Sequence, residues 1–256
     1  MIIHQAYTSI PISKFKFRSL FGMDECGDIN SPLLVFGMYR KEDVRMVLRH
    51  SRGRKTVIVW LGNDSTKVDL SKVRSENIIH TTWLPRVKEY LKLNGDIDCI
   101  LLKFPAHEKP NPMVLGPRVY AYLQKGKPKY HGSDTVLDLD MSYPLLVGDH
   151  SVPRQEWWNG IGDKWYRKSF IGLFLSEYTG GGCGIVEMGL RGRKVITNVL
   201  NLPHCIPWKT KEDVEAIIER EAEHIGIQDT YLAEEVYASL AKGKDLEHFD
   251  LERMAA

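Results

Sequence analysis

Apolar runs alternate with helical stretches along most of the chain. In the first half, runs that predict buried strands cover residues 31–38, 55–62, 77–82 and 96–104. Residues 41–50 place Val44, Val47 and Leu48 on one face of a predicted helix, and a second helix is predicted at 84–94. Near-continuous apolar strands joined by helices are typical of a parallel sheet covered on both faces. The first half is therefore predicted to consist of βαβ units.

The same alternation restarts after a proline-rich break. Residues 105–117 hold four prolines and predict an interdomain linker. Strands are predicted beyond it at 118–123, 143–148, 172–175 and 194–198. Helices are predicted at 210–225 and 230–243, and Thr210 is the expected N-cap of the first. Another helix is expected to begin near Ser133, which would be its N-cap.

This pattern predicts an α/β fold with two Rossmann-like halves facing a cleft. We assign residues 1–110 to the first domain, 111–225 to the second, and 226–256 to a C-terminal helix that packs back on the body. Open α/β sheets bind ligands beyond the carboxyl ends of their strands. The predicted site therefore lies in the cleft between the halves.

Composition narrows the function classes. The 256 residues are 43% hydrophobic and 27% charged with a net charge of +2, so a strong nonspecific nucleic-acid footprint is not required. The four cysteines are scattered, without zinc-like spacing, which favours a reducing, cytoplasmic environment. No apolar run reaches the roughly 20 residues of a membrane span, and residues 1–17 lack the pattern of a secretory signal.

Residues 169–198 form the most informative segment. A buried strand leads to Gly180, Gly181 and Gly182, then to a helix carrying Glu187 and to a second buried strand. Free backbone N–H groups and the helix dipole favour a diphosphate at such a turn. A carboxylate one turn into the helix suits two sugar hydroxyls, so the segment predicts a nucleotide-sugar site. The alternatives are a flexible glycine turn and a solvated surface glutamate.

The segment SFIGLFLSEYTGGGCGIVEMGLRGRKVITN resembles the nucleotide-binding segment of GT-B glycosyltransferases, in which a glycine loop leads into a helix with a ribose-binding glutamate. Residues 119–136 are similar to the first strand and phosphate-side loop of that family's C-terminal domain. Residues 57–64 are similar to a strand and loop of its N-terminal domain. The sequence departs from the family in its short N-terminal half and in the wide spacing of Glu177 and Glu187, which leaves Glu187 as the match.

The resemblance implies transfer of a hexose or pentose from a nucleotide diphosphate-sugar, such as a UDP-sugar, to an acceptor hydroxyl. Lys127 or Lys129 is expected to neutralise the departing diphosphate, as is Arg154. Tyr130 and His131 are expected to line the donor site. Asp64 is the candidate general base or sugar ligand; its alternative is an ordinary turn residue. We expect neither a metal nor another cofactor.

The sequence does not decide the acceptor. The leading choice is duplex DNA, with a hydroxymethylated base in viral DNA as the target. The alternatives are a saccharide, a lipid-linked intermediate and a protein. Basic residues before position 60 favour DNA, and a virus-encoded enzyme would act in the host cytoplasm. A non-catalytic nucleotide-sugar-binding protein and a sugar-nucleotide epimerase are the alternatives from other classes. The first would bind donor without transfer; the second would need no acceptor.

Overall fold

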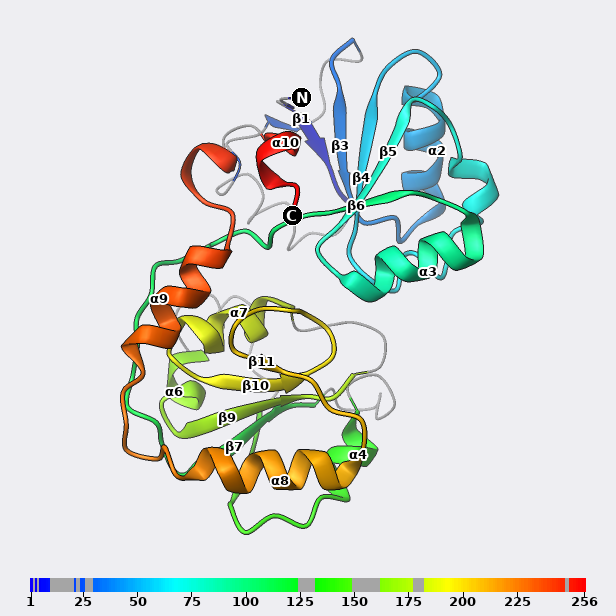
Figure 1. Cartoon of the computed structure of the whole chain (residues 1–256). Coiled ribbons are helices and arrows are strands. Elements are labelled where there is room, and N and C mark those ends of the chain that lie inside the picture. Colours follow the sequence, from blue (N-terminus) through cyan, green and yellow to red (C-terminus); the bar gives the residue numbers. More distant parts are fainter. Residues whose placement is uncertain are drawn as a thin grey trace. The chain divides into compact units, whose positions relative to one another are not determined.

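The computed structural model describes residues 1, 3, 5–9, 21, 24–25, 30–123, 132–148, 162–176, 182–246 and 249–256. The chain divides into two compact units. Unit 1 comprises Met1–His107 and Leu240–Ala256, and unit 2 comprises Glu108–Ser239. Each unit has its own parallel sheet (Figure 1). Among the described residues, no helix is both long and apolar enough to cross a bilayer.

Unit 1 is built on a six-stranded sheet of order β2-β1-β3-β4-β5-β6, in which every pair is parallel. Its strands are β1 Gln5–Tyr7, β2 Asp24–Glu25, β3 Leu33–Phe36, β4 Thr56–Trp60, β5 Ile78–Thr82 and β6 Cys99–Leu101. Its helices are α2 Lys41–His50, η1 Leu70–Val73, α3 Pro85–Gly95, η4 Gly243–Asp245 and α10 Leu251–Met254. Every residue of β3 and β4 is buried, as expected for central strands of a sheet covered on both faces.

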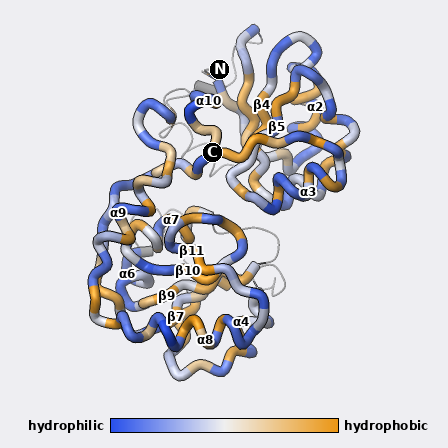
Figure 2. Tube along the Cα trace, viewed as in Figure 1, coloured by the Kyte–Doolittle hydropathy of each residue, from blue (hydrophilic) through white to orange (hydrophobic). Residues whose placement is uncertain are grey.

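Unit 2 is built on a five-stranded parallel sheet of order β11-β10-β9-β7-β8. Its strands are β7 Arg118–Tyr122, β8 Leu145–Gly148, β9 Ser169–Phe174, β10 Lys194–Thr197 and β11 Cys205–Ile206. Its helices are α4 Ser133–Leu137, α6 Gly162–Tyr166, α7 Gly182–Leu190, α8 Lys211–Ala222 and α9 Thr230–Ser239. Hydrophobic residues are concentrated along the strands (Figure 2). The side chains of successive residues in a strand such as β9 lie on opposite faces of the sheet.

Helices cover both faces of the unit 2 sheet. Val214, Ile217 and Ile218 of α8 belong to one hydrophobic core with Val119 of β7 and Leu173 of β9. On the other face α7 packs against β9 and β10 (Figure 1). The sheet is therefore doubly wound, as the alternating pattern predicted.

Two predicted boundaries differ from the structure. Unit 1 ends at His107 rather than at 110, and the segment 226–256 does not act as one element. Helix α9 contacts α7 in unit 2, whereas residues 240–256 join unit 1, where Ala255 bridges to Leu102 beside β6. The predicted segment 226–256 is thus divided between the two units, with residues 226–239 in unit 2 and residues 240–256 in unit 1.

The proline-rich segment 105–117, predicted as a linker, is bound to unit 2 over much of its length. The N–H of Asn111 donates to Leu190 O at 2.8 Å, and that of Met113 donates to Arg191 O at 3.2 Å. The guanidinium of Arg193 donates to Met113 O at 3.1 Å and to Val114 O at 2.8 Å. Prolines exclude a regular strand because they lack the N–H donor, but the neighbouring main-chain groups still find partners.

Candidate functional site

The strand order of unit 2 marks one place on its sheet where a ligand site is expected. From β7 the chain passes to β8 on one side and then to β9 on the other, so the order reverses between β7 and β9. In doubly wound sheets ligands bind outside the carboxyl ends of the two strands at such a switch point. Here those ends are Tyr122 and Phe174, and the helices that follow are α4 and α7.

Helix α7 lies close against β9 because glycines leave room for it. A Cβ on Gly172 of β9 would lie 2.4 Å from Met188 Sδ, and a Cβ on Gly184 would lie 3.2 Å from the Phe174 ring. Hydrogen at these positions therefore lets the helix approach the strand. The close packing fixes where the first turn of α7 begins.

The end of α7 is fixed as firmly. Gly192 has a φ of +74°, its N–H donates to Gly189 O at 2.9 Å, and the Arg193 N–H donates to Met188 O at 3.0 Å. These two bonds form a Schellman motif, whose left-handed position favours glycine. His204 packs on Gly189, and its Nε2 bonds Ile185 O at 2.8 Å. Burial lowers the pKa of His204 to about 4, so this contact is made by a neutral ring.

Glu187 lies in the middle of α7 and is half-buried. Its Oε2 accepts a hydrogen bond of 3.0 Å from the hydroxyl of Tyr166, the last residue of α6. Tyr166 is only 2% exposed. Burial is the main cause that raises the pKa of Tyr166 well above its ordinary value, and the charge of Glu187 is the second. The hydroxyl therefore keeps its proton and can donate the hydrogen bond. The carboxylate of Glu187 thus has a fixed partner.

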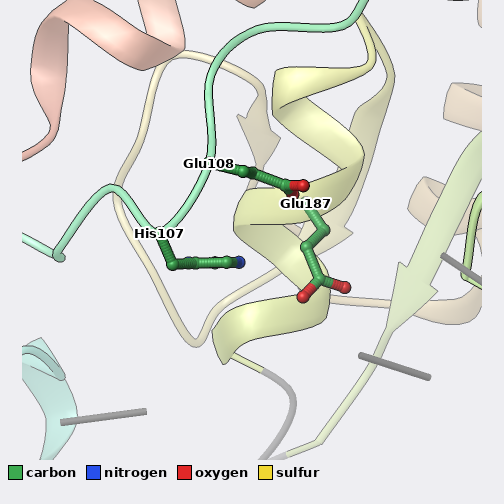
Figure 3. A group of neighbouring side chains, drawn as sticks. All are labelled: His107, Glu108 and Glu187. Atoms are coloured by element: carbon green, nitrogen blue, oxygen red, sulfur yellow. The ribbon is translucent and has the colours of Figure 1, made fainter. Parts of the chain in front are cut away.

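A second group of charges lies beside Glu187. Arg191 is buried and donates to both carboxylate oxygens of Glu108, with Nη2 at 2.9 Å from Oε2, and its Nε donates to Asp163 Oδ1 at 2.8 Å. A carboxylate oxygen of Glu108 lies within 4.8 Å of one of Glu187 (Figure 3). Glu108 is thus held in a bidentate ion pair with Arg191.

Asp64, the predicted base, lies in unit 1 in the loop after β4. Its side chain is fully buried, Oδ2 accepts from the Met38 N–H at 3.1 Å, and Oδ1 accepts from the Leu61 N–H at 3.1 Å. Burial raises the pKa of Asp64 to about 6, although these main-chain bonds lower it. The carboxyl group therefore ties the loop after β3 to the loop after β4, and its catalytic role stays a prediction.

Of the remaining predicted site residues, only Gly182 belongs to the described part of the chain. It is the first residue of α7. The following predicted residues lie outside the described part of the chain: Gly180, Gly181, Lys127, Lys129, Tyr130, His131 and Arg154. Glu177, which the family spacing left in doubt, lies outside it too.

Three neighbours of Glu187 were not predicted from the sequence: Tyr166, Glu108 and Arg191. Tyr166 belongs to a five-residue helix too short to show a period, and Glu108 is 83 residues from its partner. The one usable signal is the run Arg191-Gly192-Arg193 directly after the helix, because a glycine at that position is typical of a helix end.

No protein-family model matches the sequence, and no curated protein matches it. Solved structures do. The structure of TarM aligns with a TM-score of 0.54 at 12% identity over 84% of this chain and 53% of TarM, so the chain spans about half the length of that relative. A sucrose-phosphate synthase from Thermosynechococcus elongatus aligns at 0.49 and 12% identity, over 90% of this chain and 72% of the synthase.

The pneumococcal O-GlcNAc transferase GtfA, solved with UDP and GlcNAc, aligns at 0.42 and 12% identity, over 81% of this chain and 54% of that protein. At such identities a likeness shows the fold alone. The chain has the mixed α/β fold of GT-B glycosyltransferases, with two parallel sheets, which confirms the predicted fold class.

Proposed function

We propose that the protein is a glycosyltransferase that binds a nucleotide diphosphate-sugar at the carboxyl edge of the unit 2 sheet and moves the sugar to an acceptor hydroxyl. The observation that carries this proposal is Glu187. It is a half-buried carboxylate on the helix that follows the switch-point strand β9, and it accepts a hydrogen bond from a neutral hydroxyl. Such a group can accept hydrogen bonds from two neighbouring hydroxyls of a pentose.

The length of α7 suits one nucleotide. Gly182 begins the helix, and Glu187 follows five residues later, about 7.5 Å along the axis at 1.5 Å per residue. A diphosphate at the N-terminal N–H groups and a pentose beside Glu187 can therefore belong to the same molecule. The helix dipole favours the anion at this end.

The transfer step breaks the bond between the sugar's anomeric carbon and the diphosphate oxygen, which leaves with the electron pair. The acceptor oxygen forms the new bond and loses its proton. We assign neutralisation of the leaving diphosphate to Lys127, Lys129 or Arg154, since cations stabilise charge that develops there. Asp64 is the sequence-based candidate for the base, and its carboxyl would first have to release a main-chain N–H.

Calorimetry with UDP, ADP and GDP tests the donor site. Glu187→Ala removes the acceptor of two hydroxyls. Each hydrogen bond to a charged group contributes about 1.5–3 kcal/mol, so affinity should fall by roughly 150-fold or more. Thermal melting of the variant checks that it folds. Unchanged affinity for every diphosphate that the wild type binds would refute the donor site.

For the acceptor we propose duplex DNA, and the support is charge. The exposed side chains Lys41, Arg45, Arg49 and Arg52 follow one another at helical spacing along α2 and just beyond it. Arginine suits phosphate because its fork matches two oxygens. A modified base as the target rests on the sequence alone.

Duplex binding at increasing salt tests the acceptor. Contacts of four basic residues with phosphates predict a slope of about −3.6 in log K against log salt, since each contributes about −0.9. Arg45→Glu with Arg49→Glu should reduce the slope by about half. Exposed Arg86 and Lys88 of α3 offer the matched control, because the same reversal there should leave the slope unchanged. Absence of duplex binding at low salt would exclude DNA.

The burial of Asp64 favours one second candidate, a nucleotide-sugar-binding protein without catalysis. It would bind donor with the same dependence on Glu187. Labelled donor separates the two functions, because a transferase forms a labelled acceptor or slowly hydrolyses the donor. Tight binding with neither product would favour the non-catalytic function.

A further inference from the structure

Tyr166 donates a hydrogen bond to the side chain of Glu187, and it is itself held at several points. Its carbonyl accepts from Ser169 Oγ at 3.0 Å and from Arg193 Nε at 2.7 Å. Its ring meets Tyr120 of β7 edge to face, with centroids 5.5 Å apart. The position of the hydroxyl is therefore set by the core of unit 2.

Arg193 extends this support. Its side chain is fully buried, and it donates to main-chain carbonyls of Tyr166, Ser169, Met113, Val114 and Arg191. A planar guanidinium with five N–H donors suits this set of acceptors. Since Arg193 is also the last residue of the Schellman motif that ends α7, one residue fixes both Tyr166 and the helix that carries Glu187.

The chemistry of the partner matters as much as its position. A glutamate side chain has three rotatable bonds, and ordering it on ligand binding costs free energy. A hydroxyl orders it without cancelling its charge, whereas a cation at the same place would neutralise it. The nearby cation, Arg191, pairs its side chain with the carboxylates of Glu108 and Asp163, and it donates to the main-chain carbonyl of Glu187 at 3.5 Å.

We infer that Tyr166 is a positioning and specificity residue, which holds the Glu187 carboxylate for the 2′- and 3′-hydroxyls of a pentose and so sets a preference for ribonucleotides over their deoxy forms. This inference rests on the proposed function. It concerns the sugar of the nucleotide and not the sugar that is transferred. A purely structural tyrosine would stabilise the fold without changing this preference.

The test compares the affinities of UDP, ADP and GDP with those of their 2′,3′-dideoxy forms. The wild type should prefer the ribo form by roughly 150-fold or more, because of the same two hydrogen bonds. Tyr166→Phe should reduce this ratio about 3- to 10-fold and leave the dideoxy affinity unchanged. Glu187→Ala should abolish the preference, and adding Tyr166→Phe to it should change nothing further.

A matched control exists in unit 1. The Tyr7 hydroxyl donates to Asp43 Oδ1 at 3.1 Å, so Tyr7→Phe removes the same kind of tyrosine–carboxylate bond away from α7. It should leave the ratio unchanged. If Tyr166→Phe does not fold, Glu187→Asp serves instead, because the shorter side chain draws the carboxylate from the hydroxyl and should lower the ratio similarly.

The outcomes separate the two claims. If Tyr166→Phe weakens ribo and dideoxy forms equally, or weakens neither while Glu187→Ala abolishes the preference, the positioning role is wrong and the donor site stands. If Glu187→Ala leaves the preference unchanged, the donor site is wrong and the inference falls with it. Failure of the wild type to bind any of these diphosphates overturns both.

Discussion

Asp64 and Glu187 are two carboxyl groups near the carboxyl edges of two parallel sheets, and their surroundings differ. Asp64 is fully buried and bonds main-chain N–H groups of two loops. Glu187 is half-buried and bonds a side-chain hydroxyl. A carboxyl group whose partners are main-chain donors organises the fold, whereas a partly exposed one held by a neutral side chain is suited to a ligand. The predictions below test this contrast.

The largest effect is expected from Asp64→Ala. It leaves the N–H groups of Met38 and Leu61 buried without an acceptor, at about 1–3 kcal/mol each. The free energy of unfolding at pH 5, measured with urea, should therefore fall by about 2–6 kcal/mol. A loss below about 1 kcal/mol would show that these bonds do not hold the two loops.

The second effect is a pH dependence. Burial raises the folded-state pKa of Asp64 from 3.8 to about 6, so between these values the folded state binds more protons than the unfolded state. Its contribution to stability is fully present below about pH 3.8 and is lost as pH rises through about 6. A shift of about 2 units corresponds to about 3 kcal/mol.

Asp64→Asn removes this titration. The difference in unfolding free energy between wild type and Asp64→Asn should change by about 3 kcal/mol between pH 4 and pH 8, with the wild type losing relative stability as pH rises. A difference that is flat over this range would contradict the buried carboxyl.

A smaller effect is expected where α7 packs on β9. In Gly172→Ala the new methyl would lie 2.4 Å from Met188 Sδ, and overpacking of this kind costs about 1–3 kcal/mol. Gly53→Ala is the matched control, because nothing lies within 4 Å of its added Cβ. Equal melting temperatures for the two variants would show that α7 is not held by this contact.

The smallest change in stability is expected from Glu187→Gln. The amide oxygen can still accept from Tyr166, so the unfolding free energy should stay within about 0.5 kcal/mol of the wild type. Nucleotide affinity should nevertheless fall, since the charge is lost. A large loss of stability would place Glu187 with Asp64 among the residues that organise the fold.

Much of the fold could be predicted because buried parallel strands leave continuous apolar runs. The runs at 31–38, 55–62 and 77–82 became β3, β4 and β5. The charged segment after Thr210 became α8 with Thr210 as the expected N-cap, which also forms a capping box. Strands β1, β2 and β11 are two or three residues long, too short to leave a period. Ser133, predicted as an N-cap, is the first helical residue, because Gly132 precedes it in a left-handed conformation.

The candidate site was predictable only in part. Glu187 and Gly182 lie five residues apart in one segment, whose strand, turn and helix can be predicted from the sequence. Tyr166 meets Glu187 only because α6 and α7 flank β9 in the folded sheet, and Arg191 meets Glu108 only because the segment after His107 runs along α7. Contacts of this kind depend on strand order, which the spacing of apolar residues does not encode.

The central claim is that Glu187 binds the pentose of a nucleotide whose diphosphate lies at the start of α7. A crystal structure of the protein with the nucleoside diphosphate that binds most tightly tests it most directly. We predict the 2′- and 3′-hydroxyl oxygens at about 2.5–3.2 Å from the Glu187 carboxylate, with phosphate oxygens near the N–H groups that begin the helix. A nucleotide bound elsewhere, with Glu187 still contacting only protein groups, would contradict the claim.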